Sequence, residues 1–153
     1  MRVLLQRVVK SSVFIKKKEI SKISSGFLIL VAFCNEDNMD DIKWSIKKIL
    51  NLRLFADDNN KMNVSLLVEK KEVLIVSQFT LFSNIKKGNR PSWNQAASLK
   101  DAKKLYQNFI SEFRYIYTAN KIQTGIFGED MQIELVNDGP VTIFFDSKFK
   151  KYT

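Results

Sequence analysis

The stretch "GFLILVAF", residues 26–33, is the longest apolar run in the chain. Its length suits a strand, because a membrane span needs about 18 apolar residues. Successive residues of a strand point to opposite faces of the sheet. A run that is apolar throughout therefore predicts a central strand with both faces buried, and no membrane-spanning segment is expected.

Other strand-like runs lie on both sides of this stretch. These runs cover residues 1–9, 11–15, 20–24, 52–55, 72–82, 121–128, 131–136 and 141–145. The charged segment at residues 16–19, between the second and third runs, is expected to form the tip of a hairpin. The β-branched and aromatic content of these runs favours strands over helices.

Two segments have helical spacing instead. Asn38 and Asp41 form a capping pattern ahead of one helix, and Ser98 and Asp101 do the same ahead of a second. Their apolar stripes are Ile42, Ile46, Ile49 and Leu50 in the first and Leu99, Ala102, Leu105, Phe109, Ile110 and Phe113 in the second. The sequence predicts one α+β domain over residues 1–153, with a mostly antiparallel, barrel-like sheet and two main helices. Its unguarded strand edges favour a homodimer.

The composition is that of a globular, basic protein. Of 153 residues, 45% are hydrophobic and 27% charged, and the formal net charge is +9. Most of the cations are lysines, which attract phosphates without reading sequence. A polyanionic partner such as RNA is expected, although a lysine-rich coding bias would also inflate the surface charge. Arg2 and Arg7 interrupt the N-terminal region without a following apolar block, so the sequence predicts a soluble cytoplasmic protein without a signal peptide.

The chain contains no histidine and a single cysteine, Cys34. This composition excludes Ser-His-Asp and Cys-His nucleophile systems, His-ligated metals and thiolate zinc sites. No metal or cofactor is expected. Proton transfers in an enzyme of this composition must use carboxylates, lysines, hydroxyls, backbone groups or the substrate itself.

Three stretches contain residues that the fold alone does not require and that are candidates for a functional site. "SQFTLF", residues 77–82, places polar groups in an apolar run, either as ordinary alternation or as a strand end beside a pocket. "KKGNRPSW", residues 86–93, is a basic loop with an aromatic residue, suited to a phosphate backbone or simply to solvent. "NDGPVT", residues 137–142, has the Asp-Gly pair of a hairpin turn followed by a proline that cannot donate to a ladder. That proline either ends a strand or belongs to a backbone feature with directed carbonyls.

Taken together, these motifs resemble the D-aminoacyl-tRNA deacylases. The resemblance rests on "MRVLLQRV" at 1–8, "SQFTL" at 77–81 and "NDGPVT" at 137–142, with support from the basic loop and from "TGIFGEDM" at 124–131. It implies a barrel-like homodimer that hydrolyses the ester joining a D-amino acid to the 3′-terminal adenosine of tRNA. It also implies removal of glycine from mischarged tRNA.

The resemblance assigns a stereochemical role to Gly139 and Pro140. It implies that their peptide bond is cis and that its carbonyl oxygens project into the partner subunit's active site, where they hold the α-amino group of the substrate. An L-side chain would then clash with backbone, whereas a D-side chain or a hydrogen would not. Arg7 lies where the family's arginine braces this motif.

The resemblance places the reaction itself at "SQFT". Thr80 occupies a position once interpreted as the nucleophile, but it has no adjacent base in the sequence. We favour water attack assisted by the ribose 2′-OH, with backbone N–H groups near Phe79 and Thr80 stabilising the oxyanion. Ser77 and Gln78 are assigned to positioning, and Phe79 to packing against the terminal adenosine or the pocket floor.

Lys86 and Lys87 are candidates for contacts with acceptor-stem phosphates. Two alternatives to a deacylase stay open. One is a non-catalytic RNA-binding module, and the other is a metal-free amidase or esterase acting on small D-amino acid derivatives.

Overall fold

The computed structural model describes residues 1–150. Its main sheet has six strands, and β3 (Gly26–Ala32) lies inside it, as predicted, between β1 (Arg2–Ile15) and β6 (Glu72–Ser77). The other strands of this sheet are β2 (Lys18–Ile23), β7 (Ile122–Thr124) and β8 (Gln132–Asp146), and β4 (Arg53–Ala56) and β5 (Met62–Ser65) form a separate hairpin. The helices are α1 (Met39–Asn51), α2 (Leu66–Glu69) and α3 (Leu99–Ile116), with short 3₁₀ helices η1 (Phe79–Phe82), η2 (Ala119–Lys121) and η3 (Ser147–Phe149).

The α+β class is confirmed, and antiparallel pairing predominates in the main sheet, but the sheet is mixed because it also contains two parallel pairs. β1 pairs antiparallel with β2, β3 and β8, whereas β3 with β6 and β6 with β7 pair in parallel. Parallel neighbours need a crossover connection. The chain provides one through α1, the β4–β5 hairpin and α2 after β3, and another through α3 after β6.

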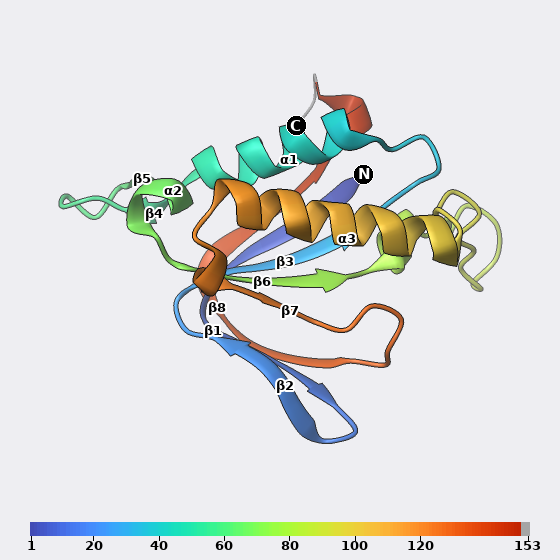
Figure 1. Cartoon of the computed structure of the whole chain (residues 1–153), viewed down its shortest axis with the longest axis horizontal. Coiled ribbons are helices and arrows are strands. Elements are labelled where there is room, and N and C mark those ends of the chain that lie inside the picture. Colours follow the sequence, from blue (N-terminus) through green and yellow to red (C-terminus); the bar gives the residue numbers. More distant parts are fainter. Residues whose placement is uncertain (151–153) are drawn as a thin grey trace.

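Both faces of β3 are covered. α1 and α3 lie side by side across one face, and the sheet curves around the other (Figure 1). Phe27, Ile29 and Val31 point into the large core beneath the helices, while Leu28 belongs to a second core inside the curve. This alternation explains why the stretch at 26–33 is apolar at every position.

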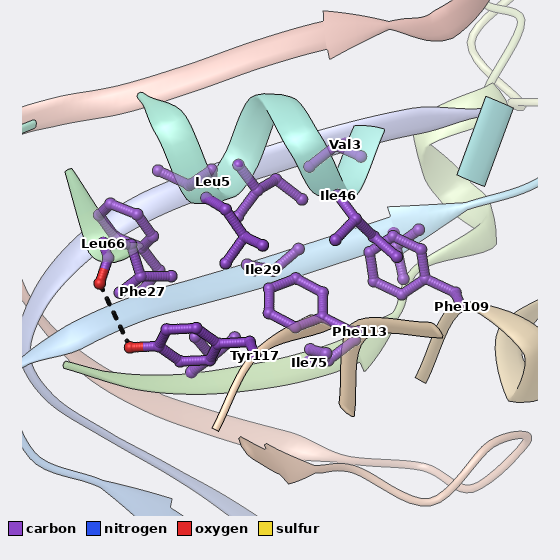
Figure 2. Packing of buried hydrophobic residues seen from close by; sticks show 14 of the residues in the cluster. Val3, Leu5, Phe27, Ile29, Ile46, Leu66, Ile75, Phe109, Phe113 and Tyr117 are labelled. Atoms are coloured by element: carbon purple, nitrogen blue, oxygen red, sulfur yellow. Dashed lines mark hydrogen bonds between the residues drawn. The ribbon is translucent and has the colours of Figure 1, made fainter. Parts of the chain in front are cut away.

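At one end of the large core, a row of aromatic side chains ends in a tyrosine whose hydroxyl is hydrogen-bonded to the backbone. Phe109, Phe113 and Tyr117 follow one another along and just beyond α3, with edge-to-face contacts between neighbouring rings. The Tyr117 hydroxyl donates to the Leu66 carbonyl at 3.3 Å (Figure 2) and to the Lys71 carbonyl at 2.7 Å. Burial of this phenol raises its pKa to about 12.

Both predicted helix starts are present. The Asn38 side chain accepts from the Asp40 and Asp41 amides, and Asp41 reaches back to the Asn38 amide, which completes a capping box. Ser98 accepts from the Asp101 amide at the start of α3. No helix within residues 1–150 combines the length and apolarity that a bilayer crossing requires.

The "NDGPVT" motif does not turn the chain between two strands, contrary to the hairpin signal. β8 runs through it without a break, and both halves of β8 pair with β1. The pairing register shifts opposite this motif, between Gln6 and Lys10. The motif is therefore an irregularity within the longest strand of the sheet.

The run at 72–82 is also not a single strand. β6 ends at Ser77, and Phe79–Phe82 forms a turn of 3₁₀ helix in which the Leu81 amide donates to the Gln78 carbonyl. The prediction of one strand-like run over residues 72–82 is therefore wrong beyond Ser77. Because the chain leaves the sheet after Ser77, the residues Ser77, Gln78 and Phe79 border a cavity.

Candidate active site

The turn at the end of β6 forms one wall of a pocket. Ser77 pairs with Val31 at the last register position of β3 and β6, and the Gln78 amide donates to the Val31 carbonyl at 2.8 Å. The chain then leaves the sheet as η1. The carboxyl ends of two parallel strands and a 3₁₀ turn thus meet at the same edge, a common location for sites in open parallel sheets.

The pocket has a volume of about 550 Å³. Its walls come from the ends of β3 and β6, the start of α3, the segment that precedes α3 and the connection from β7 to β8. The residues that line it include Ser77, Gln78, Phe79, Trp93, Leu99, Ala102, Glu129 and Asp130. The volume suits a small-molecule group, such as one nucleoside with a short substituent.

Two aromatic side chains stand at the mouth of this pocket. Phe79 and Trp93 are in edge-to-face contact with ring centroids 5.4 Å apart, and their side chains are 57% and 38% exposed. Large apolar groups left this open to solvent favour a ligand with a flat, stackable face.

Thr80 follows Phe79 in η1, is half-buried and does not itself line the pocket. Its hydroxyl oxygen accepts a hydrogen bond of 2.5 Å from the side-chain amide of Gln78. No carboxylate or lysine within residues 1–150 makes a hydrogen bond to this hydroxyl. The amide orients Thr80 but cannot take its proton, so the arrangement lacks the base that a nucleophilic threonine requires.

The backbone of η1 offers donors in the same place. The first N–H groups of a helix have no partner within it, and here these belong to Phe79 and Thr80. The remaining turn is closed, since the Ser83 amide donates to the Thr80 carbonyl at 2.9 Å.

Arg7, Asp138 and Asn137 form a second cluster, on β1 and β8. The Arg7 guanidinium donates to the Asp138 carbonyl at 3.1 Å, pairs with the Asp138 carboxylate at 2.8 Å and reaches the Leu54 carbonyl. The Asn137 side-chain amide donates to the carbonyls of Arg7 and Val141, at 2.9 Å and 3.2 Å. Arg7 therefore contacts the "NDGPVT" motif directly, beside Gly139 and Pro140.

Gly139 and Pro140 are exposed, and the peptide bond between them is cis. Neither residue lines the pocket of its own chain. The residues predicted to act together therefore fall into two groups within one chain. Ser77, Gln78 and Phe79 line the pocket and Thr80 follows them in the chain, while Arg7, Gly139 and Pro140 lie apart from it.

Lys86 and Lys87 lie in the loop between η1 and α3, and both are exposed. An isolated antiparallel bridge between Asn84 and Ser92 closes this loop, and the Lys86 amide donates to the Asn84 side chain. Trp93 follows the bridge directly. The two lysines are therefore displayed near the pocket mouth but do not line it.

Two carboxylates at the pocket rim, Glu129 and Asp130, were missed by sequence reasoning. The segment "TGIFGEDM" that contains them was noted only for its resemblance. Within residues 1–150 neither carboxylate takes part in an ion pair. The signal available was two adjacent acidic residues after a glycine in an otherwise basic chain.

A second cavity, of about 570 Å³, lies near the start of α1 and η3. It borders an ion-pair cluster in which the Lys148 ammonium lies 2.7 Å from Asp41 and 3.5 Å from Asp37. Nearby, burial above all raises the pKa of the Cys34 thiol to about 11, so it is not a ready nucleophile. Within the described residues, no three His, Cys, Asp or Glu side chains are grouped for a metal ion.

Comparisons with known proteins identify the family of this chain. The family described as D-Tyr-tRNA(Tyr) deacylase matches residues 4–146. The chain is 49% identical over 151 residues to a D-aminoacyl-tRNA deacylase of Flavobacterium psychrophilum, covering 99% of this chain and 100% of the relative. It is 47% identical over 148 residues to the protein of that name from Thermosipho africanus, covering 97% and 98%.

Solved structures give the same result at the level of the fold. The c-Myc DNA unwinding element binding protein superposes with a TM-score of 0.91 at 37% identity, covering 95% of this chain and 98% of that protein. A structure described as a probable eukaryotic D-amino acid tRNA deacylase superposes with a TM-score of 0.82 at 17% identity, covering 94% and 97%. With a family match that spans nearly all the described residues, the chain belongs to the D-Tyr-tRNA(Tyr) deacylase family.

Proposed function

We propose that the protein hydrolyses the ester bond of D-aminoacyl-tRNA, and of glycyl-tRNA formed by mischarging, as a proofreading enzyme of the cytoplasm. One observation carries the proposal. Ser77, Gln78 and Phe79, which belong to the motif that resembles the family's and lie within the matched residues 4–146, form one wall of a pocket large enough for an aminoacylated adenosine. Phe79 and Trp93 at its mouth suit the adenine ring, and Ser77 and Gln78 position the ester.

Stereochemical selection is assigned to main-chain carbonyls of Gly139 and Pro140. Fixed carbonyl oxygens hold the substrate's α-amino group, so an L-side chain is directed against backbone that cannot yield. A D-side chain or a hydrogen points away, and glycine is therefore also a substrate. Arg7 and Asn137 support this role, because their hydrogen bonds anchor the segment at both ends.

The carbonyls act in the pocket of a second copy of the chain, so the enzyme is a homodimer. Gly139 and Pro140 are exposed and lie outside the pocket of their own chain. Apolar side chains of β8, which carries Gly139 and Pro140, and of its neighbour β1 are also exposed. Val9 on β1 is 52% exposed, and Val136 and Phe144 on β8 are 45% and 50% exposed. Burying such side chains against a partner is favourable.

Water is the nucleophile, positioned or activated by the 2′-OH of the terminal ribose. Thr80 receives a hydrogen bond from Gln78 and has no base beside it, so it does not attack the ester. The N–H groups of Phe79 and Thr80 stabilise the oxyanion, and each donor of this kind contributes about 3–4 kcal/mol.

The first alternative is a non-catalytic RNA-binding module, which the basic loop with Lys86 and Lys87 would suit. The second is an esterase for small D-amino acid derivatives. A deacylation assay separates the three functions. We expect D-selective release from tRNA, weak release from L-aminoacyl-tRNA and none from D-amino acid methyl esters.

Each alternative has its own signature in the same assay. Tight tRNA binding without turnover would identify a binding module. Turnover of the methyl esters without a requirement for tRNA would identify the small-substrate esterase.

A further inference from the structure

Three lysines occupy the first half of α3. Lys100, Lys103 and Lys104 are exposed, and within residues 1–150 none of them takes part in an ion pair. The carboxylate of Asp101, on the same half of the helix, accepts instead from the Ser98 hydroxyl at 2.7 Å. The three ammonium groups therefore face solvent without compensation from the fold.

This placement works against the helix that carries it. Like charges three and four residues apart repel on a helix surface, as Lys100 does with Lys103 and Lys104. Lys100 also lies in the first turn, where the helix dipole disfavours a cation. Helix stability does not explain these lysines, whereas an external anion would.

The lysines begin at the rim of the pocket. Leu99 and Ala102 line it, and Lys103 follows Leu99 by four residues, on the same side of α3 one turn further along. The loop that leads into α3 carries the exposed cations Lys86, Lys87 and Arg90. Figure 1 shows this loop at the N-terminal end of α3, so the two sets of cations occupy one end of the molecule.

The rim formed by the β7–β8 connection has the opposite charge. Glu129 and Asp130 line the pocket there, and both are exposed. A phosphate chain that leaves the pocket is attracted toward α3 and repelled from this connection. The charge around the mouth is thus divided between two structural elements.

We propose that this division sets the path of the tRNA, an inference that rests on the proposed function. With the terminal adenosine in the pocket, the acceptor-stem backbone runs over the start of α3 and the preceding loop. Its phosphates contact Lys100, Lys103 and Lys104 together with the loop cations. Glu129 and Asp130 keep it from crossing the β7–β8 connection. Lysine suits this role, since it attracts any phosphate irrespective of sequence.

The test compares two triple variants that remove the same charge from two helices. Lys100→Gln/Lys103→Gln/Lys104→Gln alters α3, and Lys43→Gln/Lys47→Gln/Lys48→Gln alters the exposed lysines of α1. The dissociation constant for uncharged tRNA is measured from 50 to 300 mM salt (assay conditions on the order of those that resolve phosphate contacts). The α3 variant should reduce the slope of log affinity against log salt by about 2–3 and weaken binding about 10- to 100-fold at low salt.

The proposed path would be wrong if the two triple variants weakened tRNA binding equally, or if the α3 variant did not weaken it. A third variant, Glu129→Gln/Asp130→Asn, tests the repelling rim. It should bind tRNA as tightly as the wild type or up to about 3-fold more tightly, and a loss as large as that of the α3 variant would contradict the path. Because binding is read on uncharged tRNA, the result does not depend on turnover. Failure of the proposed function would instead appear as wild-type protein that binds tRNA and releases no D-amino acid.

Discussion

The side-chain amide of Asn137 donates to the backbone carbonyl of Arg7 at 2.9 Å, joining residues 130 positions apart. The same amide reaches the Val141 carbonyl at 3.2 Å. A Cβ atom on Gly139 would lie 2.9 Å from the Asn137 Oδ1 atom, so the glycine leaves room for this arrangement. The Asn137 side chain, together with Arg7 at Asp138, therefore anchors the main chain on both sides of Gly139 and Pro140.

Asn137→Ala should weaken the discrimination against L-aminoacyl-tRNA. Loss of two hydrogen bonds would free the segment to which we assign exclusion of the L-side chain, and should lower the free energy of unfolding by about 1–2 kcal/mol. We expect the ratio of kcat/KM for D- over L-substrates to fall at least about 10-fold, which corresponds to about 1.4 kcal/mol. The control is Asn51→Ala, which removes an exposed hydrogen bond from a side-chain amide to a backbone carbonyl on α1. Unchanged discrimination in a destabilised variant would show that Asn137 is purely structural.

Thr80→Ala should keep most of its activity, with kcat reduced less than about 10-fold, because the hydroxyl has no base. Wild-type enzyme should lose at least about 100-fold on a substrate whose terminal ribose lacks the 2′-OH, since general-base help is worth about that much. Single-turnover deacylation measures both. An inactive Thr80→Ala enzyme together with normal cleavage of the 2′-deoxy substrate would assign the chemistry to the threonine.

Gly26→Ala should destabilise the fold strongly. A Cβ atom at this position would lie 1.8 Å from the Glu72 carbonyl oxygen, a backbone atom in the β3–β6 pair. We expect the free energy of unfolding to fall by about 3 kcal/mol or more, as in severe overpacking. Urea denaturation of this variant and of Ser25→Ala, one residue earlier, gives the comparison. A variant within about 1 kcal/mol of wild type would show that the two strands can separate at little cost.

The Lys148–Asp41 pair should make stability depend on pH at both extremes. Burial opposes ionisation of Asp41, but hydrogen bonds from Lys148, Ser147 and the Asn38 backbone outweigh it and hold the pKa of Asp41 below its ordinary 3.8. Burial likewise disfavours the Lys148 cation, yet Asp41 raises the pKa of Lys148 above its ordinary 10.5. The stabilisation from Asp41 is therefore present above about pH 4 and lost in more acidic solution, and that from Lys148 is lost above about pH 10.5.

Lys148→Met should lower the free energy of unfolding by about 1–3 kcal/mol at pH 7, because it leaves the buried Asp41 without its cation. The difference from wild type should shrink as the pH falls below 4. Urea denaturation from pH 3 to 8 (roughly the range in which carboxylates titrate) measures this, with Lys150→Met as the control. A difference that does not vary with pH would mean that the pair contributes only packing.

The sequence predicts local structure well where the local pattern is unambiguous. The residues at 26–33 require a strand buried on both faces, and the Asn38–Asp41 and Ser98–Asp101 patterns correctly mark both long helices. Strand direction is different, because a continuous apolar run shows that both faces of a strand are buried but does not show in which direction its neighbours run. The crossover nature of the connections around α1 and α3 was needed to identify the parallel pairs.

The two motifs of the site were located but their shapes were not. "NDGPVT" carries hairpin residues, yet β1 is long enough to pair with β8 on both sides of it, and this tertiary pairing overrides the turn signal. At Phe79 the chain leaves β6 for a 3₁₀ turn, although the residues themselves favour a strand. The contact of Arg7 with Asp138 spans 131 residues and came from resemblance alone.

The pocket floor belongs to the part of the molecule that should open last. Val31 and Ser77, which line the pocket, form the last register pair of β3 and β6, and the side chains of Ile29 and Val76 in these strands are buried. By contrast, β4 and β5 form a separate two-stranded hairpin. Amide protons of β3 and β6 should then exchange with solvent only when the whole chain unfolds, while those of the hairpin exchange through local opening. On warming, the enzyme should retain full turnover while its periphery loosens, and lose it in one step with the core.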